Sequence, residues 1–123
     1  MNASSITLSR RPARRFWGWG AAADVLDAGE QARVKFMVEQ LGGQFSALPP
    51  PEIAEFNLPA PRVAAPPGLA SMFSATPHDR LNHAYGKSYA DCARMWLRSV
   101  PNPPDWVAFP DNEQAVIDIL DWA

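Results

Sequence analysis

Residues 104–123 read PDWVAFPDNEQAVIDILDWA, and this stretch decides the fold class. Trp106 to Phe109 is a short apolar run that predicts a strand. Asp111, followed by Gln114 three residues later, has the spacing of a helix N-terminus. Apolar positions then recur at helical spacing and predict an inner stripe that faces the strand: Val116, Ile119, Leu120 and Ala123. A strand, a tight turn and a helix form the first half of a βαβ unit, so we expect an α/β or α+β fold.

The second strand of such a unit does not follow in this sequence. The expected strand therefore has no parallel neighbour, and the expected helix reaches Ala123 without a glycine, a proline or a cationic last turn. We expect the chain to be a truncated fragment of a longer protein, with residues 104–123 as the start of a further domain.

Two shorter helices are expected upstream. Thr76, Pro77 and Asp79 supply a capping hydroxyl, a proline at the first helical position and an acid three residues after the cap, and this helix should end near residues 85–86. Ser88 supplies the capping hydroxyl of the second helix. The second helix should carry one inner side and be ended by prolines; that side comprises Tyr89, Cys92, Trp96 and Val100, and the prolines are Pro101, Pro103 and Pro104.

Residues 46–76 predict an extended, proline-rich arm. Prolines crowd this stretch, and no helical or alternating period is present: Pro49, Pro50, Pro51, Pro59, Pro61, Pro66 and Pro67. A structureless connection of this length is unusual within a compact domain, so an arm that crosses another surface is the simpler interpretation. Its isolated apolar residues are the candidate anchors: Phe56, Leu58, Leu69 and Phe73.

The chain thus divides into three parts: a basic segment over 1–23, a region over 24–103 that contains the arm, and residues 104–123. Within the second part, residues 28–41 predict a helix that Gly42-Gly43 would end. The basic segment holds four arginines and no acid, a bias shared by organelle transit peptides; its Arg10-Arg11 pair also fits a twin-arginine signal. The alternative is a solvated basic surface segment.

Composition excludes several classes of function. The 123 residues are 47% hydrophobic and 20% charged, with a net charge of −2, so electrostatics favour neither nucleic acid nor anionic lipid as a partner. No apolar run approaches the roughly 20 residues needed to cross a bilayer. Thirteen prolines and five tryptophans indicate a chain that lies against a partner surface.

The candidate chemical motifs are weak. Gly18 to Ala23 (GWGAAA) matches the letters of the dinucleotide fingerprint, but no strand pattern precedes it and Trp19 occupies the phosphate approach. His78 and His83 are five residues apart, about 140° around a helix, so they do not share a metal from one face. Cys92 lies on an apolar stripe and is expected to be a small buried residue.

Asp118 and Asp121 are expected on the solvated side of the last helix. The residues alone therefore assign no catalytic, cofactor-binding or metal-binding position.

Two stretches carry a resemblance to a known family. FWGWG at residues 16–20 resembles the start of alkylglycerone-phosphate synthases and their bacterial relatives, and TPHDRLNHAYGKSYAD at 76–91 is similar to the segment before their flavin domain. PDWVAFP at 104–110 resembles the opening strand of the FAD-binding domain of the vanillyl-alcohol-oxidase type. The resemblance runs from Phe16 to Ala123, except that the arm corresponds in its position along the chain and not in its residues.

The resemblance implies an FAD-dependent enzyme, either a transferase that exchanges the acyl group of acyl-dihydroxyacetone phosphate for a fatty alcohol or, alternatively, a 2-hydroxy-acid dehydrogenase or oxidase. It implies that the flavin-cradling loop and the catalytic residues lie beyond Ala123, so the partner of this chain is the rest of its own polypeptide. The expected location is cytoplasmic, with organelle import as the alternative. From a different class, the chain would be a small Pro/Trp-rich protein-interaction module.

Overall fold

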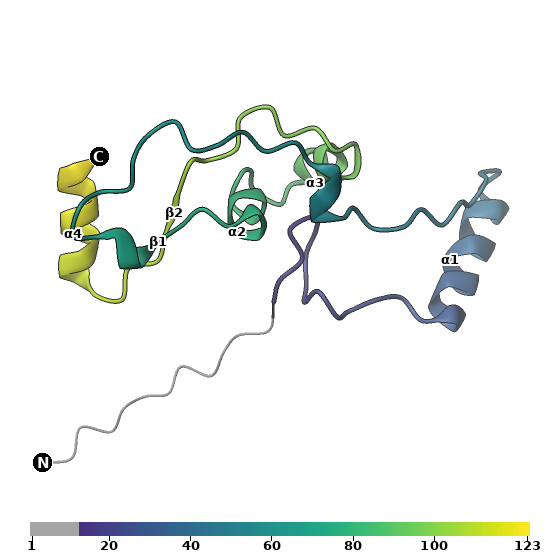
Figure 1. The fold of residues 1–123 in the computed structure, drawn as a ribbon. Helices are drawn as coiled ribbons and strands as arrows, with labels where there is room; N and C mark the ends of the chain where they lie inside the picture. The colour runs from purple at the N-terminus through teal and green to yellow at the C-terminus, as the bar shows by residue number, and fades with distance from the viewer. Residues whose placement is uncertain (1–12) are drawn as a thin grey trace, which may run out of the picture. The chain divides into compact units, whose positions relative to one another are not determined.

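The computed structural model describes residues 13–123 as a mixture of helices and very short strands (Figure 1). The elements follow in the order α1 (Ala28–Gln40), η1 (Ile53–Glu55), η2 (Ala70–Met72), β1 (Phe73–Ser74), α2 (Pro77–Asn82), α3 (Tyr89–Trp96), β2 (Val107–Ala108) and α4 (Glu113–Trp122). Four α-helices and a two-stranded sheet in this part of the chain agree with the coarse expectation of a mixed helix and strand fold.

The described residues divide into two compact units. The first contains residues 19–48 and the described residues up to Arg15. Its helix α1 matches the prediction over 28–41: the Asp27 carboxylate accepts from Glu30 N at 2.8 Å, and Gly43 N donates to Val38 O at 2.9 Å beyond Gly42, whose φ is +77°. No residue of α1 is buried.

The second unit contains residues 16–18 and 49–123, and it holds the hydrophobic core. Four buried side chains form this core: Phe16, Phe56, Leu81 and Met95. Phe16 comes from residues 16–18 (the FWG segment), Phe56 from the arm, Leu81 from α2 and Met95 from α3. The core is therefore assembled from four separated stretches of sequence.

The arm contains little regular structure, as predicted: only η1, η2 and β1 interrupt residues 46–76. It runs beside residues 98–106 with a constant offset of 43 positions, and Figure 1 shows both segments crossing the unit between α3 and β1. Glu55 is paired with Arg98, Arg62 with Asp105, and Val63 O with Trp106 Nε1. The constant offset means that the two segments run parallel.

The strand that was expected to have no parallel neighbour has an antiparallel one. β2 pairs antiparallel with β1, which is the end of the arm: Phe73 lies opposite Ala108 and Ser74 opposite Val107. Phe109 N extends the pairing by donating to Met72 O at 2.8 Å. The arm residues that precede α2 are already extended, so they offer β2 an edge that no local sequence pattern reveals.

Helix α4 begins one residue later than expected and buries a different face. Asn112, rather than Asp111, is the cap, and its side chain accepts from Ala115 N at 2.8 Å. Ala115 is buried, whereas Leu120 is 69% exposed and Val116 is also exposed, so the expected inner stripe is wrong. Ala115 and the half-buried Ile119 lie one turn apart on the inner side, and the Trp122 ring, although the residue is 42% exposed, packs edge-on against Phe73 with centroids 5.5 Å apart.

Helix α3 also differs from its prediction. It ends at Trp96, before the prolines, because Arg98 adopts a φ of +56° and Ser99 N donates to Arg94 O at 2.9 Å. Tyr89, in the first turn, is 91% exposed rather than inward-facing, and Met95 is the buried residue.

Candidate functional site

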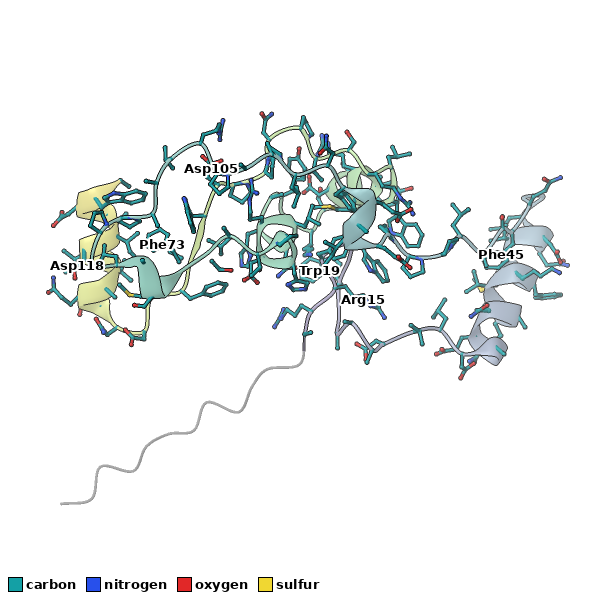
Figure 2. All side chains as sticks on the ribbon, in the orientation of Figure 1. Arg15, Trp19, Phe45, Phe73, Asp105 and Asp118 are labelled. Carbon is teal, nitrogen blue, oxygen red and sulfur yellow. The ribbon has the colours of Figure 1, made fainter. Side chains whose placement is uncertain are left out.

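The site that the fold builds most completely surrounds residues 76–91, which bind polar groups from distant stretches of the second unit. Figure 2 draws the side chains on the ribbon and labels Phe73 and Asp105, which lie in two of these stretches. Helix α2 starts as predicted: Thr76 Oγ1 accepts from Asp79 N at 3.2 Å, and Pro77 occupies the first helical position. It ends at Asn82, a few residues before the expected 85–86. His83 ends it, with Nδ1 2.8 Å from Asp79 O.

Asp79 links the helix to the sheet. Ser74 Oγ, in β1, donates to its Oδ2 at 2.5 Å, and Thr76 Oγ1 donates to the same oxygen at 2.9 Å. Partial burial raises the pKa of the Asp79 carboxyl, but the hydrogen bonds from Ser74, Thr76 and His78 outweigh burial and hold that pKa below its usual value. Asp79 is thus an anion that fixes the start of α2 against β1.

Arg80 is the least expected member of the site. It is only 4% exposed, yet its guanidinium faces no carboxylate within the described residues. Nε donates to Pro104 O and Nη1 donates to Pro59 O, both at 2.7 Å. Nη2 is buried and has no hydrogen-bond acceptor in the part of the chain that the structure describes. Arg80 therefore joins the arm to the segment before β2 through two carbonyl groups.

Lys87 holds the N-terminal FWG segment. Its ammonium donates to Phe16 O at 2.9 Å and to Asn82 Oδ1 at 3.0 Å. Ser88 then caps α3, and its hydroxyl donates to Asp91 Oδ2 at 2.8 Å while Asp91 N donates to Ser88 Oγ at 3.3 Å. Hydrogen bonds from the Ser88 hydroxyl lower the pKa of Asp91.

Aromatic packing completes the site. The Phe16 ring meets Phe56 edge-on with centroids 5.6 Å apart, and Trp17 meets Trp96 in the same way at 5.4 Å. Burial of an aromatic side chain of this kind stabilises a fold by about 1.5–3 kcal/mol. Phe16 and Trp17 therefore anchor the start of the second unit on the arm and on α3.

The histidines and the cysteine of the sequence analysis occupy separate places. His78 Nδ1 lies 3.5 Å from Asp79 Oδ1, and the exposed His83 ring meets Phe109 edge-on at 5.8 Å. Cys92 is half-buried rather than fully buried, and its sulfur lies 4.0 Å from Lys87 O. Among residues 13–123, no three His, Cys, Asp or Glu side chains gather to hold a metal.

Gly18 to Ala23 does not have the geometry of a dinucleotide-binding loop. Helix α1 opens only at Ala28, after non-helical residues, and a side chain at Gly18 would meet nothing within 4 Å, so no close approach requires this glycine. Asp118 is half-buried, and its Oδ1 accepts from Gln114 Nε2 at 2.8 Å, whereas Asp121 is exposed. Residues 18–23 thus lack the loop-to-helix geometry of a phosphate cradle.

Sequence reasoning missed the roles of Arg80 and Lys87. Both are charged residues that bind distant backbone carbonyls, 21 and 24 positions away for Arg80 and 71 for Lys87, and carbonyl acceptors leave no trace in a side-chain pattern. The only available signal was the arginine-leucine and glycine-lysine-serine pattern within residues 76–91.

Comparisons with protein-family models, curated proteins and solved structures found no match to this chain. A search of residues 13–123 for a helix with the length and hydropathy of a membrane span also found none.

Proposed function

We propose that this chain is the N-terminal region of an FAD-dependent enzyme similar to alkylglycerone-phosphate synthase, and that it acts as part of a longer polypeptide. One observation supports the proposal most. The two stretches that carry the resemblance, residues 16–20 and 76–91, are far apart in sequence, yet Phe16 and Leu81 share one core and Lys87 Nζ donates to Phe16 O. Stretches that fold against each other are expected to be retained together.

In this proposal the described residues have a structural role. Asp79, Arg80 and Lys87 each connect segments of the second unit, and none belongs to a cluster of metal-ligating side chains in residues 13–123. FAD chemistry would belong to the remainder of the polypeptide. Residues 104–123 would then be the first strand and helix of the FAD-binding domain.

The test is direct. The native gene product is isolated from its source with an antibody against residues 76–123, and its intact mass and flavin absorbance are recorded. The proposal expects a product longer than 123 residues that releases FAD on denaturation. A flavin-free product of 123 residues would overturn it.

Two assays on the same product distinguish the transferase from the dehydrogenase. Acyl-dihydroxyacetone phosphate with a fatty alcohol tests the transferase, and 2-hydroxy acids with an artificial electron acceptor test the alternative dehydrogenase. The 123-residue chain alone should show no saturable change in FAD fluorescence; micromolar binding would contradict this assignment of the flavin site.

A second candidate, a protein-interaction module, is favoured by helix α1. Large apolar side chains on it and at its C-cap are exposed, with Phe36 and Met37 both at 63% and Leu41 at 86%, and exposed apolar residues of this kind are typical of surfaces that meet a partner. A flavin-free 123-residue product would support this candidate.

A further inference from the structure

Residues 13–24 form a loop whose shape is set by its own hydrogen bonds. Arg15 N donates to Gly20 O at 3.2 Å, and Arg15 Nε donates to Ala21 O at 2.9 Å. Gly20 has a φ of +94°, in the left-handed region that glycine adopts without strain. Asp24 Oδ2 accepts from Ala21 N at 2.7 Å and closes the loop. All of these bonded residues belong to the first unit, so the loop keeps its shape without the help of the second unit.

Only the tip of this loop, the FWG segment, belongs to the second unit. Phe16 is 7% exposed and packs in the core, and Trp17 packs edge-on against Trp96 with centroids 5.4 Å apart. Lys87 Nζ donates to Phe16 O at 2.9 Å. We call the side chains that receive the tip the socket: Phe56, Leu81, Lys87, Met95 and Trp96. A buried aromatic anchor and a charge-assisted hydrogen bond to a carbonyl are contacts by which proteins hold peptide ligands.

A long connection joins the FWG segment to its socket. The socket lies entirely within residues 49–123, and residues 19–48 of the connection belong to the first unit. Helix α1, within this connection, buries none of its residues. A ligand on such a tether has an effective concentration of roughly 1 mM at its site. The same segment from a second molecule therefore competes for the socket as its concentration approaches this value.

We propose that the FWG segment is an exchangeable ligand: the socket of one chain binds it from the same chain or from a second copy. The segment carries its anchors with it, since both rings and the bound carbonyl lie in residues 16–17. Its loop is preorganised, so docking costs little further conformational entropy. Two chains that exchange segments form the same contacts again, and only the tether distinguishes the single chain from the pair. The inference is independent of FAD binding by the longer polypeptide.

The peptide of residues 13–24 tests this exchange. Its receptor is the ¹⁵N-labelled 123-residue chain with Phe16→Ala and Trp17→Ala, whose own segment lacks both rings. We expect saturable binding with a Kd below about 1 mM and, by hydrogen exchange, restored protection of α2 and α3. The Trp17→Ala peptide should bind at least roughly tenfold more weakly, equivalent to about 1.4 kcal/mol. The Trp19→Ala peptide is the matched control and should bind like the parent peptide, because Trp19 is 69% exposed.

The wild-type chain supplies a second measurement that does not depend on the folding of a variant. Sedimentation should show a monomer at about 10 µM and a dimer near the roughly 1 mM effective concentration of the tethered segment. An excess of the parent peptide should return the dimer to a monomer, whereas the Trp17→Ala peptide should not. A parent peptide that fails to bind, equal binding of the Trp17→Ala peptide, a chain that stays monomeric at millimolar concentration, or a dimer that the parent peptide leaves intact would each overturn the proposal.

Discussion

Single polar residues connect the segments of the second unit, and Arg80 shows how. A buried guanidinium usually faces a carboxylate, since an unpaired buried charge is costly. Arg80 instead donates to the carbonyls of Pro59 and Pro104, two residues that have no N–H of their own and leave a free acceptor in irregular backbone. The planar fork of arginine reaches both carbonyls at once, which a lysine ammonium does less well.

Arg80→Lys should lower the free energy of unfolding by about 1.5–3 kcal/mol, because at least one charge-assisted hydrogen bond is lost and a buried carbonyl is left unpaired. Urea unfolding followed by tryptophan fluorescence measures this loss. Arg94→Lys is the matched control, since Arg94 pairs with Asp91 at the surface and exposed pairs contribute about 0–1 kcal/mol. Equal effects of the two substitutions would exclude the bridging role of Arg80.

Asp79 makes the stability of the fold depend on pH in the acid range. Its folded-state pKa lies below the usual carboxyl value, so the unfolded chain binds the proton more tightly and folding is stabilised above that usual value. Stability should fall as the pH drops through the ordinary carboxyl range toward the lowered folded-state pKa. Asp79→Asn should flatten this acid limb of a stability-against-pH curve while lowering stability at neutral pH. An unchanged acid limb in the variant would show that Asp79 does not supply the dependence.

Helices and strands of this protein depend to different degrees on their surroundings. Asp27 and Glu30 form a reciprocal cap for α1 without burying any residue of that helix. Helix α4 instead contacts the end of the arm through Trp122, whose ring packs edge-on against Phe73. Strand β2 exists because β1 pairs with it.

The register of α4 is tested by two substitutions on adjacent faces. Ala115→Leu adds volume at a position that is 5% exposed and should cost about 1–3 kcal/mol of unfolding free energy. Leu120→Ala removes volume at a position that is 69% exposed and should change it by no more than about 0.5 kcal/mol. Chemical denaturation with far-ultraviolet circular dichroism measures both. A larger loss of stability from Leu120→Ala than from Ala115→Leu would show instead that Val116 and Leu120 face inward, as the sequence pattern predicts.

At the scale of the whole chain, a few large side chains from distant stretches hold the second unit together. Phe16, Phe56, Leu81 and Met95 are its buried cluster, and Phe16 reaches this cluster from a segment more than 30 residues before the arm contributes Phe56. Contacts of such long sequence separation incur loop-closure entropy before they stabilise anything. A small core of this kind predicts modest stability for the 123-residue chain.

Phe16→Ala should therefore lower the stability of the second unit by about 3–5 kcal/mol and remove hydrogen-exchange protection from α2 and α3. Phe36→Ala is the matched control, because Phe36 in α1 is 63% exposed and should leave that protection unchanged. Hydrogen exchange with mass spectrometry reads both effects. Retained protection of α2 and α3 in the Phe16→Ala chain would refute the role of this residue in the core.

Local signals were sufficient for most helix starts. The caps at Thr76 and Ser88, and the glycine stop at residues 42–43, were read correctly because a cap depends on neighbours within three or four positions. The α4 cap was misplaced by one residue because Asp111 and Asn112 are both good capping residues, and only the turn from β2 selects between them. The left-handed Arg98 that ends α3 has no comparable signal, because non-glycine residues rarely adopt that conformation.

The sequence by itself determined where α2 and α3 begin and that the proline-rich arm would contain little regular structure. These features follow from hydrogen bonds and torsions within a few residues. Only the tertiary structure decided that β1 pairs with β2, that Ala115 and Met95 face inward, and that Arg80 and Lys87 bind distant carbonyls. Each of these features depends on which segments meet in space. Every residue carries a backbone carbonyl, and any extended segment offers a strand edge. The sequence therefore does not single out the partner of a given side chain or strand, and the fold decides it.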